Sequence, residues 1–197
     1  MKIAVINEGT AVVSQWAGGK SSQYFIYPEN SNYASRDFKF RISKAVSFSD
    51  EEAKYTMLEN YTRHLIMLEG TARVYHKGHY DLTMEPYKDI DIFDGGWESS
   101  AEGMVTDFNL MVSKDCFGRM SVIDEDCAAQ NDWCVQCGRP YFCTAFYCGN
   151  GHAVFKLDSE TIRAEAGDLV VFEDIPQDFK VHVSLSSSRL VRMDVCM

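Results

Sequence analysis

Short runs of β-branched and aromatic residues, separated by turn-forming residues, constrain the fold of this chain more than any other feature. Gly, Asp, Asn or Pro follows most of these runs, and a run of this kind is typical of a β-strand. Strands at such spacing predict an all-β sandwich or barrel. Helical periodicity is weak, and only residues 50–60, with Asp50 as a cap, predict a turn or two of helix. The runs are Phe38 to Ser43, Leu65 to Leu68, Val105 to Val112, Tyr141 to Tyr147, Ala153 to Leu157, Leu169 to Phe172 and Leu190 to Val195.

One of these strands carries an arginine at a position of special interest. Residues 63–70 predict a buried strand that runs into a turn at Gly70, and Thr71 to His76 predict the returning strand. In metal-binding cupin barrels, the pattern before such a turn is roughly H-x-H-x(3–4)-E-x(6)-G, which places Arg63 where the glutamate stands. A guanidinium has five donors and no lone pair for a metal. We therefore expect no metal here, and an anion, above all a carboxylate, as the alternative.

The two histidine positions of that pattern are also occupied by other residue types. They fall on Met57 and Glu59, or on Thr56 and Leu58, depending on the spacing. The sequence therefore offers no cupin metal-ligand set before Gly70, and we expect no cofactor.

Composition restricts the partners. The chain has 197 residues, enough for one large β-domain or two small halves, and its formal net charge is −10. Nucleic acid and anionic membranes would repel such a surface, so we expect neither as a partner. The sequence leaves the oligomeric state open, with a homodimer as one alternative.

The cysteines and the N-terminus indicate a compartment. Seven cysteines are an odd number, and residues 1–9 are too short and too soon polar for a signal peptide. No run of 18 apolar residues is present for a membrane span. We therefore expect a reduced, cytoplasmic protein.

Two halves of the chain share features. Leu68 to Gly70 and the stretch from Pro86 to Phe93 mark the first half, and residues 148–151 with Glu165 to Phe172 mark the second. Ala-Gly-Asp before an apolar strand is a common cupin turn, in which Gly167 supplies the permissive backbone and Asp168 a local hydrogen bond. The second half also lacks metal ligands. Its histidine position is Val170, and its glutamate position is Phe142 or Thr144.

Four segments together resemble the HutD/Ves family of cupin-like proteins. They are Trp16 to Ser21, Phe40 to Ser43, Arg63 to Gly70 and Thr106 to Met111. The resemblance covers roughly residues 10–115, with only the turn at residues 166–168 supporting it further along. The stretch from Cys116 to Cys148, rich in cysteine, departs from the family.

The resemblance implies an all-β bicupin, with two jelly-roll barrel halves in one compact unit and no known metal. Residues 1–197 would be a single HutD/Ves-like domain, with a first cupin-like half at 1–112 and a second at 113–197. It also implies a link to histidine utilisation or stress response, without an established catalytic activity. The ligand it implies is a small acidic metabolite.

A polar set of residues is the candidate ligand-binding site. Its two arginines and its lysine suit a carboxylate, its asparagine donates or accepts, and its tryptophan offers an apolar wall. The alternative is that Arg41 and Arg63 form structural salt bridges with Asp107. Strand alternation places Asp107, Asn109 and Met111 on one face and Arg63 opposite to His64. The set comprises Trp16, Lys20, Arg41, Arg63, Asp107 and Asn109.

Two other groups of residues are candidate metal sites. Cys134 and Cys137, with Cys143 and Cys148, would bind zinc only if all four sulfurs converged, and buried free thiols are the favoured interpretation. His76 and His79 lack a neighbouring carboxylate or thiolate in sequence, which favours a surface hairpin. No Ser-His-Asp triad is evident.

The sequence therefore predicts metal-independent binding of a small carboxylate metabolite by a sensor or accessory factor. Two alternatives stay open. One is an isomerase or hydrolase that uses Asp107 or His64 for proton transfer, which a perturbed carboxylate in a closed pocket would favour. The other is an interaction module without a ligand.

Overall fold

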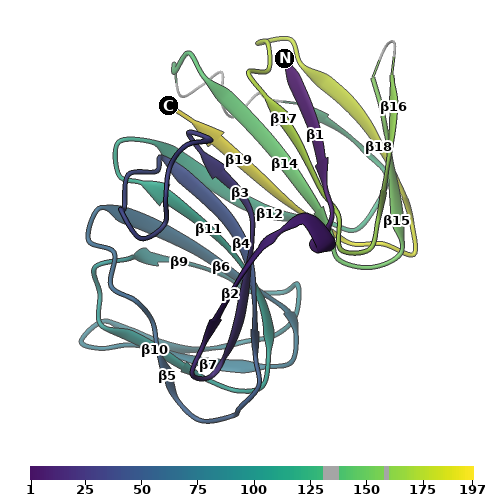
Figure 1. The fold of residues 1–197 in the computed structure, drawn as a ribbon. Helices are drawn as coiled ribbons and strands as arrows, with labels where there is room; N and C mark the ends of the chain where they lie inside the picture. The colour runs from purple at the N-terminus through teal and green to yellow at the C-terminus, as the bar shows by residue number, and fades with distance from the viewer. Residues whose placement is uncertain (131–137, 158–159) are drawn as a thin grey trace. The chain divides into compact units, whose positions relative to one another are not determined.

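The computed structural model describes residues 1–130, 138–157 and 160–197, and this part of the chain is almost entirely β-structure (Figure 1). It contains nineteen strands and one short 3-10 helix, Glu8–Thr10. Every strand pairing among the described residues is antiparallel. The all-β cupin-like fold class predicted from the sequence is confirmed. No helix in the described part is long and apolar enough to cross a membrane.

The chain forms two compact units, which we call the first unit (residues 11–114) and the second unit (residues 1–10 and 115–197). The first unit consists of two sheets with an apolar cluster that includes Leu65, Met67, Val74 and Phe93. Its six-stranded sheet has the order β2 (Val12–Trp16), β3 (Gly19–Tyr27), β4 (Phe40–Ser47), β11 (Thr106–Ser113), β6 (Tyr61–Glu69) and β9 (Ile90–Asp94). Its four-stranded sheet has the order β5 (Ala53–Lys54), β10 (Ser99–Glu102), β7 (Ala72–His76) and β8 (Tyr80–Met84).

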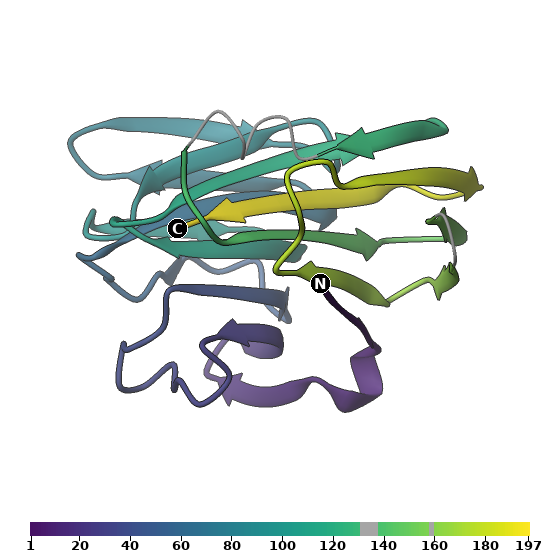
Figure 2. The same ribbon diagram turned by 90° about the horizontal axis from the view of Figure 1, so that it is seen from above.

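The second unit also has two sheets, and the N-terminal strand belongs to it. β1 pairs with β17, as Figure 1 shows, and in the view from above the N-terminus lies beside this same sheet (Figure 2). The five-stranded sheet has the order β1 (Lys2–Ile6), β17 (Leu169–Glu173), β14 (Phe142–Cys148), β19 (Leu190–Cys196) and β12 (Phe117–Ile123). The four-stranded sheet has the order β13 (Cys127–Gln130), β18 (Lys180–Ser186), β15 (His152–Lys156) and β16 (Thr161–Glu165).

Four strands of the larger sheet recur in the two units. The order β9-β6-β11-β4 of the first unit corresponds to β17-β14-β19-β12 of the second. In each case a long, buried strand, β6 or β14, is flanked by a short apolar strand and by the last strand of the unit. The similarity of the two halves that the sequence indicated is therefore present in the strand order.

The glycine turns have the predicted geometry. Gly70 joins β6 to β7 with a φ of 74°, and a Cβ atom there would lie 2.3 Å from the carbonyl oxygen of Met104. Only glycine fits such a backbone and such a close approach. In the second unit Gly167 has a φ of 92°, and Asp168 accepts a hydrogen bond from the Glu165 backbone amide.

The helical turn expected at residues 50–60 is absent. This described segment contains the two-residue strand β5 and otherwise lacks regular structure. β5 pairs with β10, where Lys54 lies opposite Ser100. Pairing with a sheet edge outweighs the weak helical preference of a segment with no apolar stripe.

Candidate ligand-binding site

A cavity of about 310 Å³ lies within the first unit, lined by residues of both of its sheets. Polar and charged side chains reach it from the six-stranded sheet, and the segment that contains β5 lines it from the other side. Three aromatic residues, Trp16, Tyr33 and Tyr55, add apolar walls. The charged residues that line it are Arg41, Lys54, Arg63 and Asp107. Cations outnumber carboxylates here, although the whole chain is acidic.

Strand alternation on three neighbouring strands builds one wall of this cavity. Met111 of β11 lies opposite Arg41 of β4 on one side and opposite Arg63 of β6 on the other. Since paired strands are about 4.8 Å apart, the two arginines start from backbone positions about 10 Å apart. Asn109 and Asp107 follow on the same face of β11. The two guanidinium groups can therefore approach one small ligand from either side of β11.

Arg63 is buried but incompletely hydrogen-bonded. It is 6% exposed, and its Nη2 donates to Oδ1 of Asn109 at 2.9 Å. Its guanidinium carbon lies 4.7 Å from the Tyr55 ring centre and 5.2 Å from that of Phe93, so two aromatic faces hold the cation. Its Nε is buried and has no hydrogen-bond partner among the described residues. A buried donor without a partner is costly, and an acceptor in the cavity would relieve that cost.

Arg41 is held more firmly than Arg63. Its Nε donates to Gln23 and its Nη1 donates to Ser43, both at 2.7 Å, and its guanidinium lies 4.5 Å from the Tyr33 ring centre. Burial lowers the pKa of Arg41 to about 10, and the positive charge of Arg63 contributes to this shift. Arg41 therefore stays charged at neutral pH, and the two arginines repel each other. An anion between them would remove that repulsion.

Asp107 is the only carboxylate among the described residues that line the cavity. Burial raises its pKa to about 7, while Arg63 and a hydrogen bond from Asn109 act in the opposite direction. Neither arginine forms an ion pair with Asp107 among the described residues; the amide of Asn109 bridges Arg63 and Asp107 instead. The alternative of structural salt bridges among these residues is therefore wrong. A pKa of about 7 places the titration of Asp107 near neutral pH.

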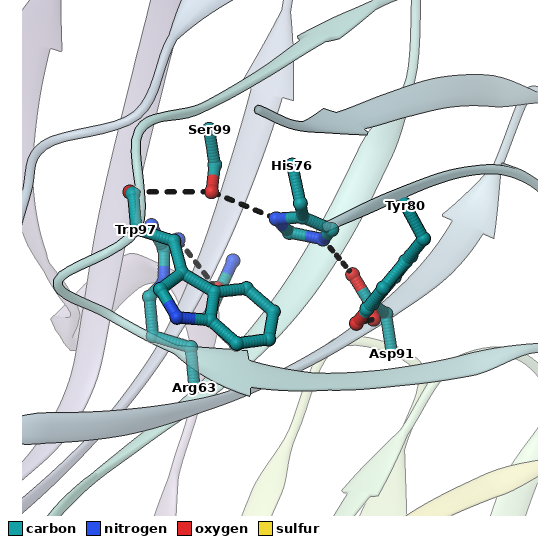
Figure 3. A network of polar contacts seen from close by, with 7 residues as sticks. Arg63, His76, Tyr80, Asp91, Trp97 and Ser99 are labelled. Carbon is teal, nitrogen blue, oxygen red and sulfur yellow. Dashed lines mark hydrogen bonds and ion pairs between the residues drawn. The ribbon is translucent and has the colours of Figure 1, made fainter. Parts of the chain in front are cut away.

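A second polar network surrounds the ring of His76 (Figure 3). The Nε2 atom of His76 is 2.8 Å from Oδ2 of Asp91, and its Nδ1 atom is 2.7 Å from the Ser99 hydroxyl. Tyr80 donates to the other oxygen of Asp91 at 2.7 Å. The hairpin predicted at His76 and His79 is present, because β7 pairs with β8 and His76 lies opposite Tyr80. The His79 side chain is exposed as expected, but that of His76 is buried, so its surface position was wrongly predicted.

This network contains a serine, a histidine and an aspartate, which the sequence did not indicate as a group. Ser99 is 4% exposed and is not among the residues that line the cavity, so its hydroxyl is not placed to attack a bound molecule. The His76 ring lies 4.3 Å from the Phe93 ring, which contacts Arg63 on the cavity side. The network thus supports the aromatic residue against which Arg63 packs.

The structure brings together five of the six residues proposed as the site. Trp16, Arg41, Arg63, Asp107 and Asn109 all line the cavity. Trp16 is positioned by the tight turn that joins β2 to β3, where a Cβ atom on Gly18 would lie 2.3 Å from the indole ring. The glycine allows the ring to fold over the turn.

Lys20 is the exception. It does not line the cavity, although its neighbour Ser21 does, because alternation along β3 directs the two side chains to opposite faces. The lysine of the cavity is Lys54 instead. His64, as its alternation with Arg63 predicts, is buried away from the cavity lining.

Sequence reasoning missed Tyr33, Lys54 and Tyr55. The last two belong to the segment that was interpreted as a helical turn, and Tyr33 lies in a loop between β3 and β4. No periodic pattern marks any of them. The only sequence signal for the two tyrosines is that they stand in polar segments of a chain with two arginines in strands. Aromatic faces commonly cover guanidinium groups.

The side chains of the cavity do not suit a metal ion. Among the described residues, no group of three or more His, Cys, Asp or Glu side chains is arranged to hold one. Arg63 offers no lone pair at the position that a cupin metal ligand would occupy. The metal that many cupins carry therefore does not fit this cavity.

The four-cysteine zinc alternative has a geometric obstacle. Cys134 and Cys137 lie outside the described residues. Cys143 and Cys148 are five residues apart on β14, which separates them by about 16 Å. Cys148 belongs to the apolar cluster of the second unit and Cys143 does not, so the two sulfurs face opposite sides of the sheet and cannot share one zinc ion.

The two-sheet units and the strand order define a cupin-type protein, and comparisons with known proteins agree. A crystal structure of a conserved protein of unknown function from Pseudomonas aeruginosa PAO1 is similar over 100% of both chains, with a TM-score of 0.81 and 14% identity. HutD from Pseudomonas fluorescens SBW25 has a TM-score of 0.77 and 16% identity, over 99% of this chain and 98% of that one. The bacterial pirin YhhW from Escherichia coli, in complex with nickel(II), has a TM-score of 0.64 and 10% identity, over 98% of each chain.

The sequence itself matches the HutD family model over residues 9–190. The chain therefore belongs to the HutD family, as the resemblance of its sequence segments predicted. A search of curated proteins found no match. At identities of 10–16%, the similar structures establish the fold and not the ligand.

Proposed function

We propose that the cavity of the first unit binds a small metabolite through a carboxylate, and that the protein acts as a metal-independent sensor or accessory factor. The observation that carries this proposal is the Arg63 guanidinium. Its Nε–H is buried, has no partner among the described residues, and belongs to a side chain that lines the cavity. A carboxylate suits a guanidinium because both groups are planar and two parallel hydrogen bonds can form.

The rest of the cavity supports the same ligand class. Arg41 and Lys54 add positive charge, so an anion gains from the electrostatic field of all three cations. Trp16, Tyr33 and Tyr55 offer apolar surface for the remainder of a small molecule. Membership of the HutD family implies a role linked to histidine utilisation or stress response, which makes small acids of histidine breakdown the first ligands to test.

A thermal-shift screen of urocanate, formylglutamate, glutamate and formate tests the proposal. Formate is included because one structure of the Pseudomonas fluorescens HutD is described as a formate condition. A ligand that binds only the folded state must raise the melting temperature. We expect at least one acid to do so for the natural protein and not for Arg63→Gln. Lys20→Gln removes a lysine that does not line the cavity and should behave like the natural protein.

One observation favours a second candidate function, proton transfer. The pKa of Asp107 is raised to about 7 by burial, which suits a general acid or base near neutral pH. His64 is a poorer candidate because it does not line the cavity. Incubation of a bound acid in D₂O, followed by NMR, tests this function: loss of a carbon-bound proton signal that depends on Asp107 indicates catalysis, and retention of every signal indicates binding alone.

A further inference from the structure

Asp107, Asn109 and Arg63 form a chain of hydrogen bonds along one wall of the cavity. Arg63 donates from Nη2 to Oδ1 of Asn109, and the Nδ2 atom of Asn109 donates to Oδ1 of Asp107. The direction of both bonds fixes the orientation of the amide. Oδ2 of Asp107 makes no hydrogen bond with the described residues, and Asp107 lines the cavity. Oδ1 of this carboxyl group therefore already accepts a hydrogen bond, whereas Oδ2 is available to a ligand.

We propose that Asp107 binds the ligand while Asp107 itself is a neutral carboxylic acid, so that an anion bound at Arg63 is accompanied by the uptake of a proton from solvent wherever Asp107 was ionised before binding. This inference rests on the proposed carboxylate-binding function. The proton resides on Oδ2, which then donates a hydrogen bond to the anion, while Oδ1 keeps its bond from Asn109. An O–H donor to a carboxylate forms one of the shorter and stronger hydrogen bonds in proteins.

The charges around Asp107 determine whether its pKa rises or falls when an anion binds. Arg63 on β6 stabilises the ionised form of Asp107, as does the hydrogen bond from Asn109 on its own strand. An anion at Arg63 offsets the stabilising positive charge and adds a negative one, so the pKa of Asp107 must rise on binding. The free protein starts near the midpoint, because burial already raises this pKa to about 7. A modest further rise is therefore enough to protonate the group.

The other charged or titratable groups near Asp107 are consistent with a rise of its pKa when an anion binds. Arg41 on β4, Lys54 on β5 and Tyr33 between β3 and β4 also line the cavity. Tyr55, after β5, has a pKa raised by burial and by the charges of Asp107 and of Asp91 on β9, so it stays neutral. With cations in excess, the cavity favours anions over cations or zwitterions. A ligand with a positive group would instead keep Asp107 ionised and release a proton.

The consequence is selectivity that depends on pH. The protonated Asp107 favours a ligand that presents an acceptor oxygen with no proton of its own. If one proton enters with each anion, the affinity falls by about tenfold for each pH unit above the pKa of the free protein. Below that pKa the affinity becomes nearly independent of pH, because Asp107 is then protonated before the ligand arrives.

NMR of the whole protein with ¹³C-labelled aspartate carboxyl groups, using formate as the probe, tests this inference. The Asp107 signal is assigned from its absence in Asp107→Asn and followed between pH 5 and 9. We expect a midpoint near 7 without formate and a midpoint at least about one unit higher at saturating formate. In Asp107→Asn, formate binding should lose its pH dependence; Asp81→Asn, a change in an exposed residue of β8, should keep it.

The outcomes separate this inference from the proposed function. If formate binds and the Asp107 midpoint stays the same or falls, the inference is wrong and carboxylate binding stands. If neither formate nor any of the other three acids of the screen binds even at pH 6, the carboxylate proposal is overturned, and this inference with it.

Discussion

The first and second units carry different residue types at matching positions of their larger sheets. Arg63 pairs with Phe93 of the neighbouring short strand, and Thr144 pairs with Phe172 in the same way. The strand on the other side contributes Asn109 in the first unit, and Arg192 at the matching place in the second. In the first unit, the cation Arg63 thus lines a cavity. In the second unit, the buried Arg192 forms an ion pair with Asp194 inside the protein.

In the described part of the second unit, phenylalanine rings pack against one another and the buried Asp194 forms ion pairs with arginines. Phe146, Phe155 and Phe172 pack with ring centres 5.1–6.1 Å apart. Asp194 is 1% exposed, and its Oδ1 accepts hydrogen bonds from Thr144 and from Nε of Arg192, both at 2.9 Å. Asp194 therefore has its counter-charge within the fold. Arg63 has one neutral hydrogen-bond partner and two aromatic neighbours, which leaves its charge available to a ligand.

The largest loss of stability is expected from a substitution in the second unit. Arg192→Gln removes the cation that donates to the buried Asp194 and leaves only the longer ion pair with Arg119, at 3.5 Å, so it should destabilise the protein by about 3 kcal/mol, the lower end of the range for a broken buried pair. Arg63→Gln should cost about 1 kcal/mol or less, because it removes one neutral hydrogen bond and a repulsion with Arg41. Urea unfolding of both variants gives the two values. Equal losses of stability would mean that Arg63 is as structural as Arg192.

A smaller effect is expected on affinity in the first unit. Arg63→Lys keeps the charge but loses the planar fork and its Nε–H, so the affinity for a carboxylate should fall by about tenfold. Isothermal titration calorimetry with whichever acid the screen identifies provides the measurement. His64→Ala is a useful contrast, because His64 lies on the same strand but does not line the cavity. A large loss of affinity in that variant alone would place the ligand on the other face of β6.

The stability of the protein should depend on pH through Asp107. Its pKa in the folded protein is about 7, above the unfolded value near 4, because burial disfavours the charge. The folded state therefore binds this proton more tightly, and the stabilisation is complete below about pH 4 and is lost as the pH rises through 7. Asp107→Asn, which cannot ionise, should be more stable than the natural protein at pH 8, by about 2 kcal/mol, relative to their difference at pH 4. Melting temperatures of both proteins from pH 4 to 8 measure this. Parallel curves would mean that Asp107 titrates normally.

The smallest effect concerns the aromatic support of Arg63. Tyr55→Leu removes one of the two rings that face its guanidinium and should reduce affinity about threefold, the size of an ordinary cation–π contact. Tyr55→Phe keeps the ring and should bind as the natural protein does. The same titration calorimetry distinguishes the two variants, and a loss in Tyr55→Phe would instead indicate a hydrogen bond from the phenol to the ligand.

The fold was largely predictable because its signals are local. Each of the seven apolar runs overlaps a strand, and the turns at Gly70 and Gly167 have the left-handed backbone that only glycine adopts easily. The segment at residues 50–60 failed because its structure comes from pairing with β10, and no sequence pattern records such an edge contact. The first half of β3, from Gly19 to Gln23, is polar and lacks the apolar run on which strand prediction depends.

The site was predictable where strand alternation decides the direction of a side chain. Arg63, Asp107 and Asn109 were correctly placed on one surface by their positions in β6 and β11. Lys20 was misplaced because the register of β3 could not be read from a segment without alternating hydrophobicity. Tyr33 and Tyr55 were missed because loops bring them to the cavity from distant parts of the sequence. The raised pKa of Asp107 depends on burial, which the sequence does not report.

The central claim is that the Nε–H of Arg63 donates a hydrogen bond to the carboxylate of a ligand. The most direct test observes the NMR signal of this N–H group. Its ¹⁵N–¹H signal can be assigned by its loss in Arg63→Lys and followed while urocanate, formylglutamate, glutamate or formate is added. We predict that a bound acid moves this signal downfield and that the midpoint matches the dissociation constant from calorimetry, because the donor gains a charged acceptor. A ligand that binds while this signal stays unmoved, with equal affinity for Arg63→Lys, would contradict the account.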